Sequence, residues 1–207
     1  MTLVGQLQID REQFHADLDR ICQPRAATGI RRLIEAFMLI CLSLVNYRNL
    51  MAMNYWLMKS EPEVYGIQDL ARDQQTIWDG VRNYQARNFL REMQVGDLAF
   101  FYHSNTTPPG IVGLMQIVQT GLADPSQFDP SSKYYDAKST KANPRWQTVQ
   151  VEYVETFVNF ISLDQLRQQF TPEQLGVVRQ GNRLSVMPVA TPVAEKILAI
   201  SQGKAKP

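Results

Sequence analysis

The sequence has few of the residues that build metal sites, disulfide frameworks and phosphate-binding loops. Its 207 residues include two cysteines and two histidines. Cys22 and Cys41 form no CxxC pair and no zinc motif with His15 and His103. The glycine-rich motifs GxxxxGK[ST] and GxGxxG are also absent. We therefore expect no metal, no cofactor, and a reducing intracellular location: cytoplasmic, or nucleoid or nuclear if the host is a eukaryote.

A strong excess of charge of either sign is missing as well. Lys and Arg number 21 against 20 Asp and Glu, which gives a formal net charge of +1. A protein that coats DNA by releasing counterions needs a far larger basic surplus. If this chain binds nucleic acid, the sequence predicts that it does so through a local site.

No set of residues has the spacing of a catalytic centre. His103 and Ser104 are neighbours in a predicted strand, so their side chains point to opposite faces, which is poor geometry for a nucleophile and its base. No pair of carboxylates has a spacing that marks general acid–base chemistry. We therefore expect a protein that is not an enzyme.

The first 52 residues differ from the rest of the chain. The apolar run at residues 33–45 is shorter than the roughly 20 residues that cross a bilayer, and it is placed poorly for a signal peptide. Three interpretations stay open: a buried or partner-packing helix, a weak membrane-associated segment, or an upstream stretch that is not translated in the native protein. We favour the third, with Met53 as the start, because an orderly pattern begins at residue 55.

From Asn54 onward, short strands alternate with short helices, without the regular βαβ pattern of a doubly wound sheet. This favours an α+β fold with a curled, mostly antiparallel sheet and helices at its rim. Strands are expected at 55–59, 98–103, 111–120, 148–157 and 183–189. Helices are expected at 67–71, 84–93 and 163–170, in a short segment opened by Thr171-Pro172, and at 191–201.

Three features favour binding. The turn at Trp78-Asp79-Gly80 places a large aromatic ring among polar residues, where either a neighbouring loop or a ligand base could cover it. Arg87 lies on the helix that follows. The segment 121–146 is long for a loop inside a compact domain, which is typical of functional loops. It carries a basic cluster, Lys133, Lys138, Lys141 and Arg145, together with the aromatic residues Tyr134, Tyr135 and Trp146. Trp56 lies in an apolar strand and is expected in the core.

Seven segments occur in an order that resembles the EVE domain, a family with a PUA-like fold. They are YWLMKSEP (55–62), WDGVRNYQARNFLR (78–91), GDLAFFYHS (96–104), PGIVGL (109–114), YYDAKS (134–139), PRW (144–146) and RLSVMPV (183–189). The resemblance extends from about residue 54 to residue 200. It implies a PUA-like pseudo-barrel at residues 53–201, with 1–52 as an extension and 202–207 as a frayed tail.

The resemblance also implies an aromatic-lined pocket for a modified nucleobase, with modified cytosine the expected class. Carried over by position, the base-pocket residues are Lys59, Ser60, Glu61, Trp78, Val81, Arg82, Asn83, His103, Ser104, Tyr134, Trp146, Arg183 and Ser185. Arg87 and Lys138 are expected to contact phosphate. The expected partner is therefore DNA or RNA with a modified base. Two alternatives stay open: a pocket for a free nucleoside or small metabolite, and an enzyme that processes nucleic acid.

Overall fold

The computed structural model describes residues 53–203. The interpretations of the apolar run at 33–45, of Met53 as a start, and of Cys22, Cys41 and His15 fall wholly or partly outside these residues. None of the helices between residues 53 and 203 is both long and apolar enough to cross a membrane.

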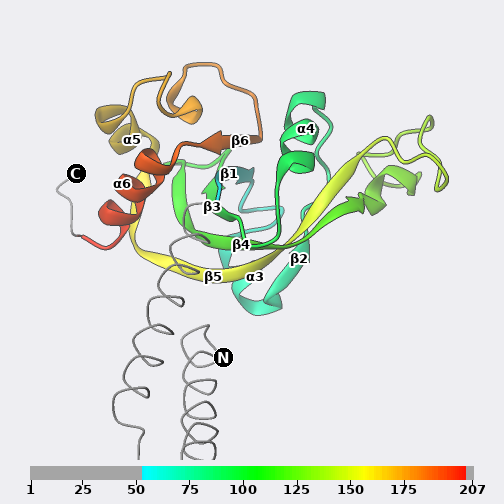
Figure 1. Ribbon diagram of the computed structural model, residues 1–207, viewed down its shortest axis with the longest axis horizontal. Coiled ribbons are helices and arrows are strands. Elements are labelled where there is room, and N and C mark those ends of the chain that lie inside the picture. Colours follow the sequence, from blue (N-terminus) through cyan, green and yellow to red (C-terminus); the bar gives the residue numbers. More distant parts are fainter. Residues whose placement is uncertain (1–52, 204–207) are drawn as a thin grey trace, which may run out of the picture. The chain divides into compact units, whose positions relative to one another are not determined.

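A single six-stranded sheet organises this part of the chain (Figure 1). Its strands lie in the order β2-β5-β4-β3-β1-β6. All neighbouring pairs are antiparallel except β1 and β3, which are parallel. The sheet is curled and open, with β2 and β6 at its edges, so the pseudo-barrel does not close. The α+β class and the mostly antiparallel sheet are confirmed. The strands are β1 (Tyr55–Ser60), β2 (Gln75–Ile77), β3 (Leu98–His103), β4 (Gly110–Ala123), β5 (Gln147–Ser162) and β6 (Val186–Val189).

The helices begin where the sequence offers capping residues. The side chain of Asn83 accepts hydrogen bonds from the backbone amides of Gln85 and Ala86 and so opens α4. Ser162 and Gln165 form the predicted capping box of α5. The four α-helices are α3 (Ile67–Asp73), α4 (Tyr84–Glu92), α5 (Leu163–Gln169) and α6 (Thr191–Ser201), and the 3-10 helices are η1 (Pro125–Phe128) and η2 (Gly176–Val178).

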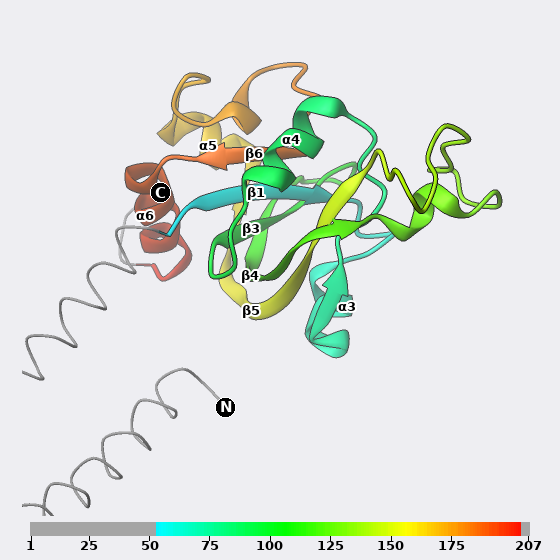
Figure 2. The same ribbon diagram turned by 45° about the vertical axis from the view of Figure 1, so that its right-hand side comes forward.

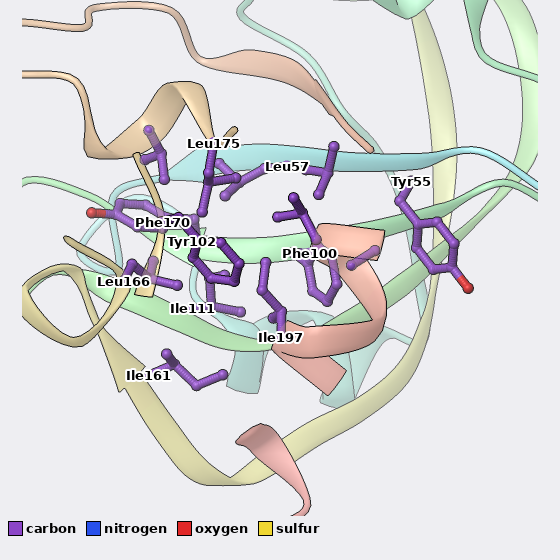
Figure 3. Packing of buried hydrophobic residues seen from close by; sticks show 14 of the residues in the cluster. Tyr55, Leu57, Phe100, Tyr102, Ile111, Ile161, Leu166, Phe170, Leu175 and Ile197 are labelled. Carbon is purple, nitrogen blue, oxygen red and sulfur yellow. The ribbon is translucent and has the colours of Figure 1, made fainter. Parts of the chain in front are cut away.

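Helices cover both faces of the sheet because alternate residues of β1 and β3 face opposite sides. Leu57 and Phe100 belong to a cluster completed by residues of α5 and α6, such as Ile197 (Figure 3). Met58 and Phe101 belong to a second cluster with residues of α3 and α4. All four of these β1 and β3 side chains are fully buried. The central strands are therefore rigid supports for whatever lies at their ends.

Trp56 is buried, as predicted, and its polar ring atom has a partner. Its indole Nε1–H donates to the carboxylate of buried Asp97 at 2.8 Å. The same carboxylate accepts the backbone amides of Asn54 and Gln94, each at 3.0 Å. Asp97 thus ties the beginning of β1 to the turn between α4 and β3.

The hairpin of β4 and β5 bends as it crosses the molecule and carries the long loop at its far end (Figures 1 and 2). Several register shifts interrupt its pairing, one of them beside Gly113. A Cβ there would lie 2.5 Å from the carbonyl oxygen of Glu155, so the close approach of the two strands needs glycine.

Some predicted elements differ from the structure. Thr171-Pro172 opens a single turn and not a helix, because Gly176 follows and the chain continues as the short η2. The last strand begins at Val186 and not at Arg183, since the side chain of Asn182 accepts the amide of Leu184 and holds a turn there. The edge strand β2 was not predicted, and β4 and β5 extend beyond their predicted ends.

Candidate nucleic-acid interface

A cavity of about 1000 Å³ opens at the ends of β1 and β2. All of the predicted base-pocket residues line it except His103 and Trp146. Nine further residues complete the lining: Val64, Tyr65, Thr76, Ile77, Asp79, Gly80, Asn105, Lys133 and Asn182. We call this the central cavity.

Trp78 is held in the cavity wall by its backbone. Its amide donates to the carbonyl of Val149 at 2.9 Å, and its carbonyl accepts the hydroxyl of Thr148. Its ring packs edge-to-face on Phe101, with centroids 5.3 Å apart, and is 7% exposed. The sequence left open whether a neighbouring loop or a ligand covers this ring; the protein itself buries most of Trp78, and the residue lines the cavity.

An ion pair joins the Trp78 turn to the long loop. Arg82 donates to the carboxylate of buried Asp124 at 2.7 Å and to the carbonyl of Tyr134 at 2.7 Å. Asp124 also accepts the amide of Gly80 at 2.9 Å and that of Ser126 at 2.8 Å. Arg82 therefore lines the cavity while its donors are used to shape the wall.

Tyr134 brings a second aromatic ring to the cavity. The Arg82 guanidinium lies 5.5 Å from its ring centroid and the Lys133 ammonium 5.0 Å. The ring also rests against the backbone of Gly80, where an added Cβ would lie 2.6 Å from a ring carbon. Only glycine at position 80 allows this contact.

The segment at the end of β1 uses most of its polar atoms locally. The Ser60 hydroxyl donates to the carbonyl of Tyr65 at 2.7 Å, which closes a turn. The Lys59 ammonium donates to the carbonyl of Asn182 at 3.2 Å, and burial lowers the pKa of this lysine. Glu61 is exposed and accepts the side chain of Asn105 at 3.1 Å. Of the three side chains, Glu61 extends furthest toward solvent.

His103 and Trp146 lie outside the lining of the central cavity. The Nε2 of His103 accepts the backbone amide of Ile67 at 3.1 Å, so this histidine supports the beginning of α3. Trp146 is buried, stacks on Tyr84 with centroids 4.9 Å apart, and donates its indole N–H to Asp136 at 2.8 Å. Both side chains have protein partners that explain their positions.

The two residues predicted to contact phosphate differ in their surroundings. Arg87 donates to the carbonyl of Arg145 at 3.1 Å and to the side chain of Asn88 at 2.9 Å, and it lies over the rings of Tyr84 and Trp146. Lys138 is exposed on the long loop. Neither lines the central cavity, and their role stays a prediction.

Sequence patterns did not reveal the residues that organise the long loop. Gln127 is fully buried, and its amide group makes four hydrogen bonds, to backbone atoms of Asp124, Arg145 and Trp146. The Asp-Pro pair at 124–125 predicts a turn. It does not predict that the Asp124 carboxylate accepts hydrogen bonds from Gly80 and Arg82 in the opposite wall of the cavity.

The central cavity combines flat rings with hydrogen-bonding groups. Trp78, Tyr65 and Tyr134 supply the rings, while Glu61 and Asp79 supply acceptors. Residues 53–203 contain no cluster of three or more His, Cys, Asp or Glu able to hold a metal ion. The fold is thus an α+β domain with a cavity at the ends of its strands that offers both aromatic surfaces and hydrogen-bond acceptors.

Comparison with known proteins defines the family. The family model described as the EVE domain matches residues 54–200. The chain therefore belongs to the EVE domain family. Its sequence is 43% identical to thymocyte nuclear protein 1 of Rattus norvegicus over 169 residues, which cover 73% of this chain and 75% of the relative.

Two solved structures are similar to the described fold. A protein from Pseudomonas syringae has 50% sequence identity and a TM-score of 0.68, over 71% of this chain and 99% of that one. The human THYN1 protein in complex with DNA containing 5-methylcytosine has 40% identity and a TM-score of 0.68, over 74% of this chain and 99% of that one.

Proposed function

We propose that this protein is a non-catalytic reader that binds DNA and places a modified cytosine in the central cavity. The observation that carries the proposal is the agreement between two lines of evidence. The cavity joins aromatic rings to hydrogen-bonding groups, and a relative with 40% identity forms a complex with DNA containing 5-methylcytosine.

The size of the cavity fits a base together with its sugar. Its volume of about 1000 Å³ lies at the upper end of the range for ligand pockets, about 300–1000 Å³. Moving a base out of a duplex costs a few kcal/mol, and stacking on an aromatic ring returns about 1–3 kcal/mol. Tyr134 and Trp78, of which Trp78 is only 7% exposed, are the rings that line the cavity for this contact.

Carboxylates in the cavity suit a base with an exocyclic amino group, such as cytosine. An aspartate or glutamate accepts a hydrogen bond from the exocyclic amino group of cytosine. Asp79 directly follows Trp78 in the sequence. Its pKa is raised, first because it is partly withdrawn from water and second by the negative charge of Asp124. Asp79 is the acceptor that we assign to this amino group.

The test compares short labelled oligonucleotides, single-stranded and duplex, that differ only in one methyl group on a central cytosine. We expect tighter binding of the methylated strand by about 10- to 100-fold, since a methyl group in an apolar pocket contributes about 1–3 kcal/mol. Trp78→Leu should abolish the preference, and Trp78→Phe should keep part of it. Because Trp78 also packs on Phe101, thermal melting of both variants must show that they are folded.

Equal affinity of the wild type for both strands would contradict the proposal. Strong binding of free 5-methyldeoxycytidine, with no gain from flanking phosphates, would favour a nucleoside-binding protein. The same titration with RNA strands decides whether DNA is preferred.

A further inference from the structure

Two smaller hollows lie beside the central cavity, with volumes of about 460 and 280 Å³. Both are built around the loop that joins η2 to β6. Asn182 and Arg183 line all three spaces, and Arg179 lines the two smaller ones. A ligand in the central cavity can therefore continue across this loop without leaving the surface.

The charge of these two hollows is entirely basic. Lys59, Arg167, Arg179 and Arg183 occur among their lining residues, and no Asp or Glu does. In a chain with almost equal numbers of acidic and basic residues, this is a strong local separation of charge. The central cavity, in contrast, contains Glu61 and Asp79.

The arginines of this surface are accessible. Arg179 and Arg183 are exposed, and neither forms an ion pair with another residue between 53 and 203. Arg167 pairs with Asp164 at 3.3 Å, and the two side chains are 45% and 83% exposed. Such a surface pair contributes little to stability, so Arg167 can change partner at small cost.

The loop that carries Arg179 and Arg183 is held in place by Asn182. The side chain of Asn182 donates to the carbonyl of Gly176 and accepts the amide of Leu184. Its carbonyl accepts the ammonium of Lys59 at 3.2 Å. A loop fixed at its centre presents its arginines with less ordering cost than a mobile one.

We infer that the sugar-phosphate backbone next to the bound base crosses this surface, with Arg183, Arg179 and Arg167 contacting successive phosphates. We call these three residues the arginine ridge. The inference rests on the proposed function, because the base in the central cavity fixes where the strand begins. Arginine suits the role, since its planar guanidinium binds phosphate oxygens in pairs.

The ridge does not include the two residues for which the sequence predicted phosphate contact, and neither of them lines any of the three spaces. The donors of Arg87 are engaged by Arg145 and Asn88, and Lys138 lies on the long loop, outside the lining of all three spaces. Phosphate contact at the arginine ridge and phosphate contact at Arg87 and Lys138 are alternative paths for the strand. One experiment distinguishes the ridge from Lys138.

The experiment measures the affinity of the full chain for a short labelled single strand with one 5-methylcytosine, over about 50–200 mM salt. The variants are Arg179→Gln, Arg167→Gln and their combination. Arg183 is left unchanged because it also lines the central cavity. Lys196→Gln in α6 is the matched control, since it removes one exposed positive charge outside all three spaces, and Lys138→Gln tests the other assignment.

Each phosphate contact that is lost lowers the slope of log affinity against log salt by about 0.7 for a single strand. We expect this change in each single ridge variant and about twice the change in the combination. Neither Lys196→Gln nor Lys138→Gln should alter the slope. The ratio of affinities for methylated and unmethylated strands should be the same in all variants as in the wild type.

Wild-type slopes in Arg179→Gln and in the combined variant would overturn the arginine ridge, as would an equal loss in Lys196→Gln. A lowered slope in Lys138→Gln alone would move the strand to the long loop. If the ridge variants lower the slope but the wild type has no preference for the methylated strand, the ridge stands and the proposed function is wrong. If the wild type binds neither strand, both are wrong.

Discussion

Arg82 and Asp124 lie 42 residues apart in sequence and form an ion pair of 2.7 Å that is almost closed to water. The side chain of Asp124 is 2% exposed and that of Arg82 is 20% exposed. The pair fastens the Trp78 turn to the start of the long loop, and thus two walls of the central cavity to one another. Its partners are all protein atoms, so its contribution to binding is to position the cavity wall.

Replacing Arg82 with methionine should therefore damage both stability and binding. The change leaves the Asp124 carboxylate buried without its cation, for which a loss of about 3–5 kcal/mol is typical. Urea unfolding measures that loss, and the oligonucleotide titration should show weaker binding to methylated and unmethylated strands alike. Arg91→Met is the control, because Arg91 is an exposed arginine that donates to Gln147 outside the cavity. Normal binding in Arg82→Met would contradict the positioning role.

The ring of Tyr134 rests on Gly80, so we expect a side chain at position 80 to weaken binding. Alanine at position 80 has to accept a φ of +78° and would place its Cβ 2.6 Å from the Tyr134 ring. Gly121→Ala is a matched control, because Gly121 has a φ of +71° and no atom within 4 Å of an added Cβ. Both variants carry the backbone cost of about 1–2 kcal/mol. Only Gly80→Ala should also lose affinity for the methylated strand, and equal affinities in the two variants would show that the ring position is unimportant.

The sequence predicted the central strands and the cavity wall better than the loops, for a physical reason. Apolar runs such as 98–103 and the cap at Asn83 are local signals, and each gave an element near its true bounds. The ion pair between Arg82 and Asp124 joins residues that lie 42 positions apart, and no local sequence pattern predicts such a contact. The same holds for β2, whose three residues form a strand only because β5 lies beside them.

The resemblance to a family placed most residues around one cavity but could not assign each side chain its partner. Trp146 and His103 belong to motifs that predicted pocket residues. In the structure, however, the indole N–H of Trp146 donates to Asp136, and the Nε2 of His103 accepts the amide of Ile67. The sequence predicts a turn at Asp79, and only the fold shows that this residue lines the same space as Trp78.

Asp79 gives a prediction on pH. Only the ionised carboxylate is a pure acceptor for the cytosine amino group. Since partial desolvation and Asp124 raise its pKa, protonation on acidification should begin at a higher pH than for an ordinary aspartate. Affinity for the methylated strand should fall as pH decreases through that raised value. Asp79→Leu should bind at least about 10-fold more weakly at neutral pH.

A comparison of pH profiles isolates this effect from titration of the nucleic acid. Both proteins are titrated with the same oligonucleotide. If affinity declines more steeply with falling pH in the wild type than in Asp79→Leu, the difference is caused by protonation of the Asp79 carboxyl group. Parallel profiles would remove Asp79 from the recognition of cytosine.

His103 gives a prediction on stability. Its Nε2 accepts the amide of Ile67, which requires the neutral ring, and burial lowers the pKa of His103 below its ordinary value of 6.5. Above that value both the folded and the unfolded states hold a neutral ring, so the contribution is fully present. As the pH falls below about 6.5, the unfolded state takes up a proton first, and the free energy of unfolding decreases until the lowered folded pKa is passed.

His103→Gln offers the matched comparison, because the glutamine side chain supplies an oxygen that can accept the Ile67 amide and does not titrate. Urea unfolding of both proteins at a series of pH values from above 6.5 downward gives the difference in unfolding free energy. The wild type should lose more stability than His103→Gln over this interval, while the methyl preference measured at neutral pH stays the same in both. Since His15 and every carboxyl group are common to the two proteins, their titrations cancel in the difference. Equal losses would mean that His103 is as easily protonated in the folded protein as in the unfolded chain.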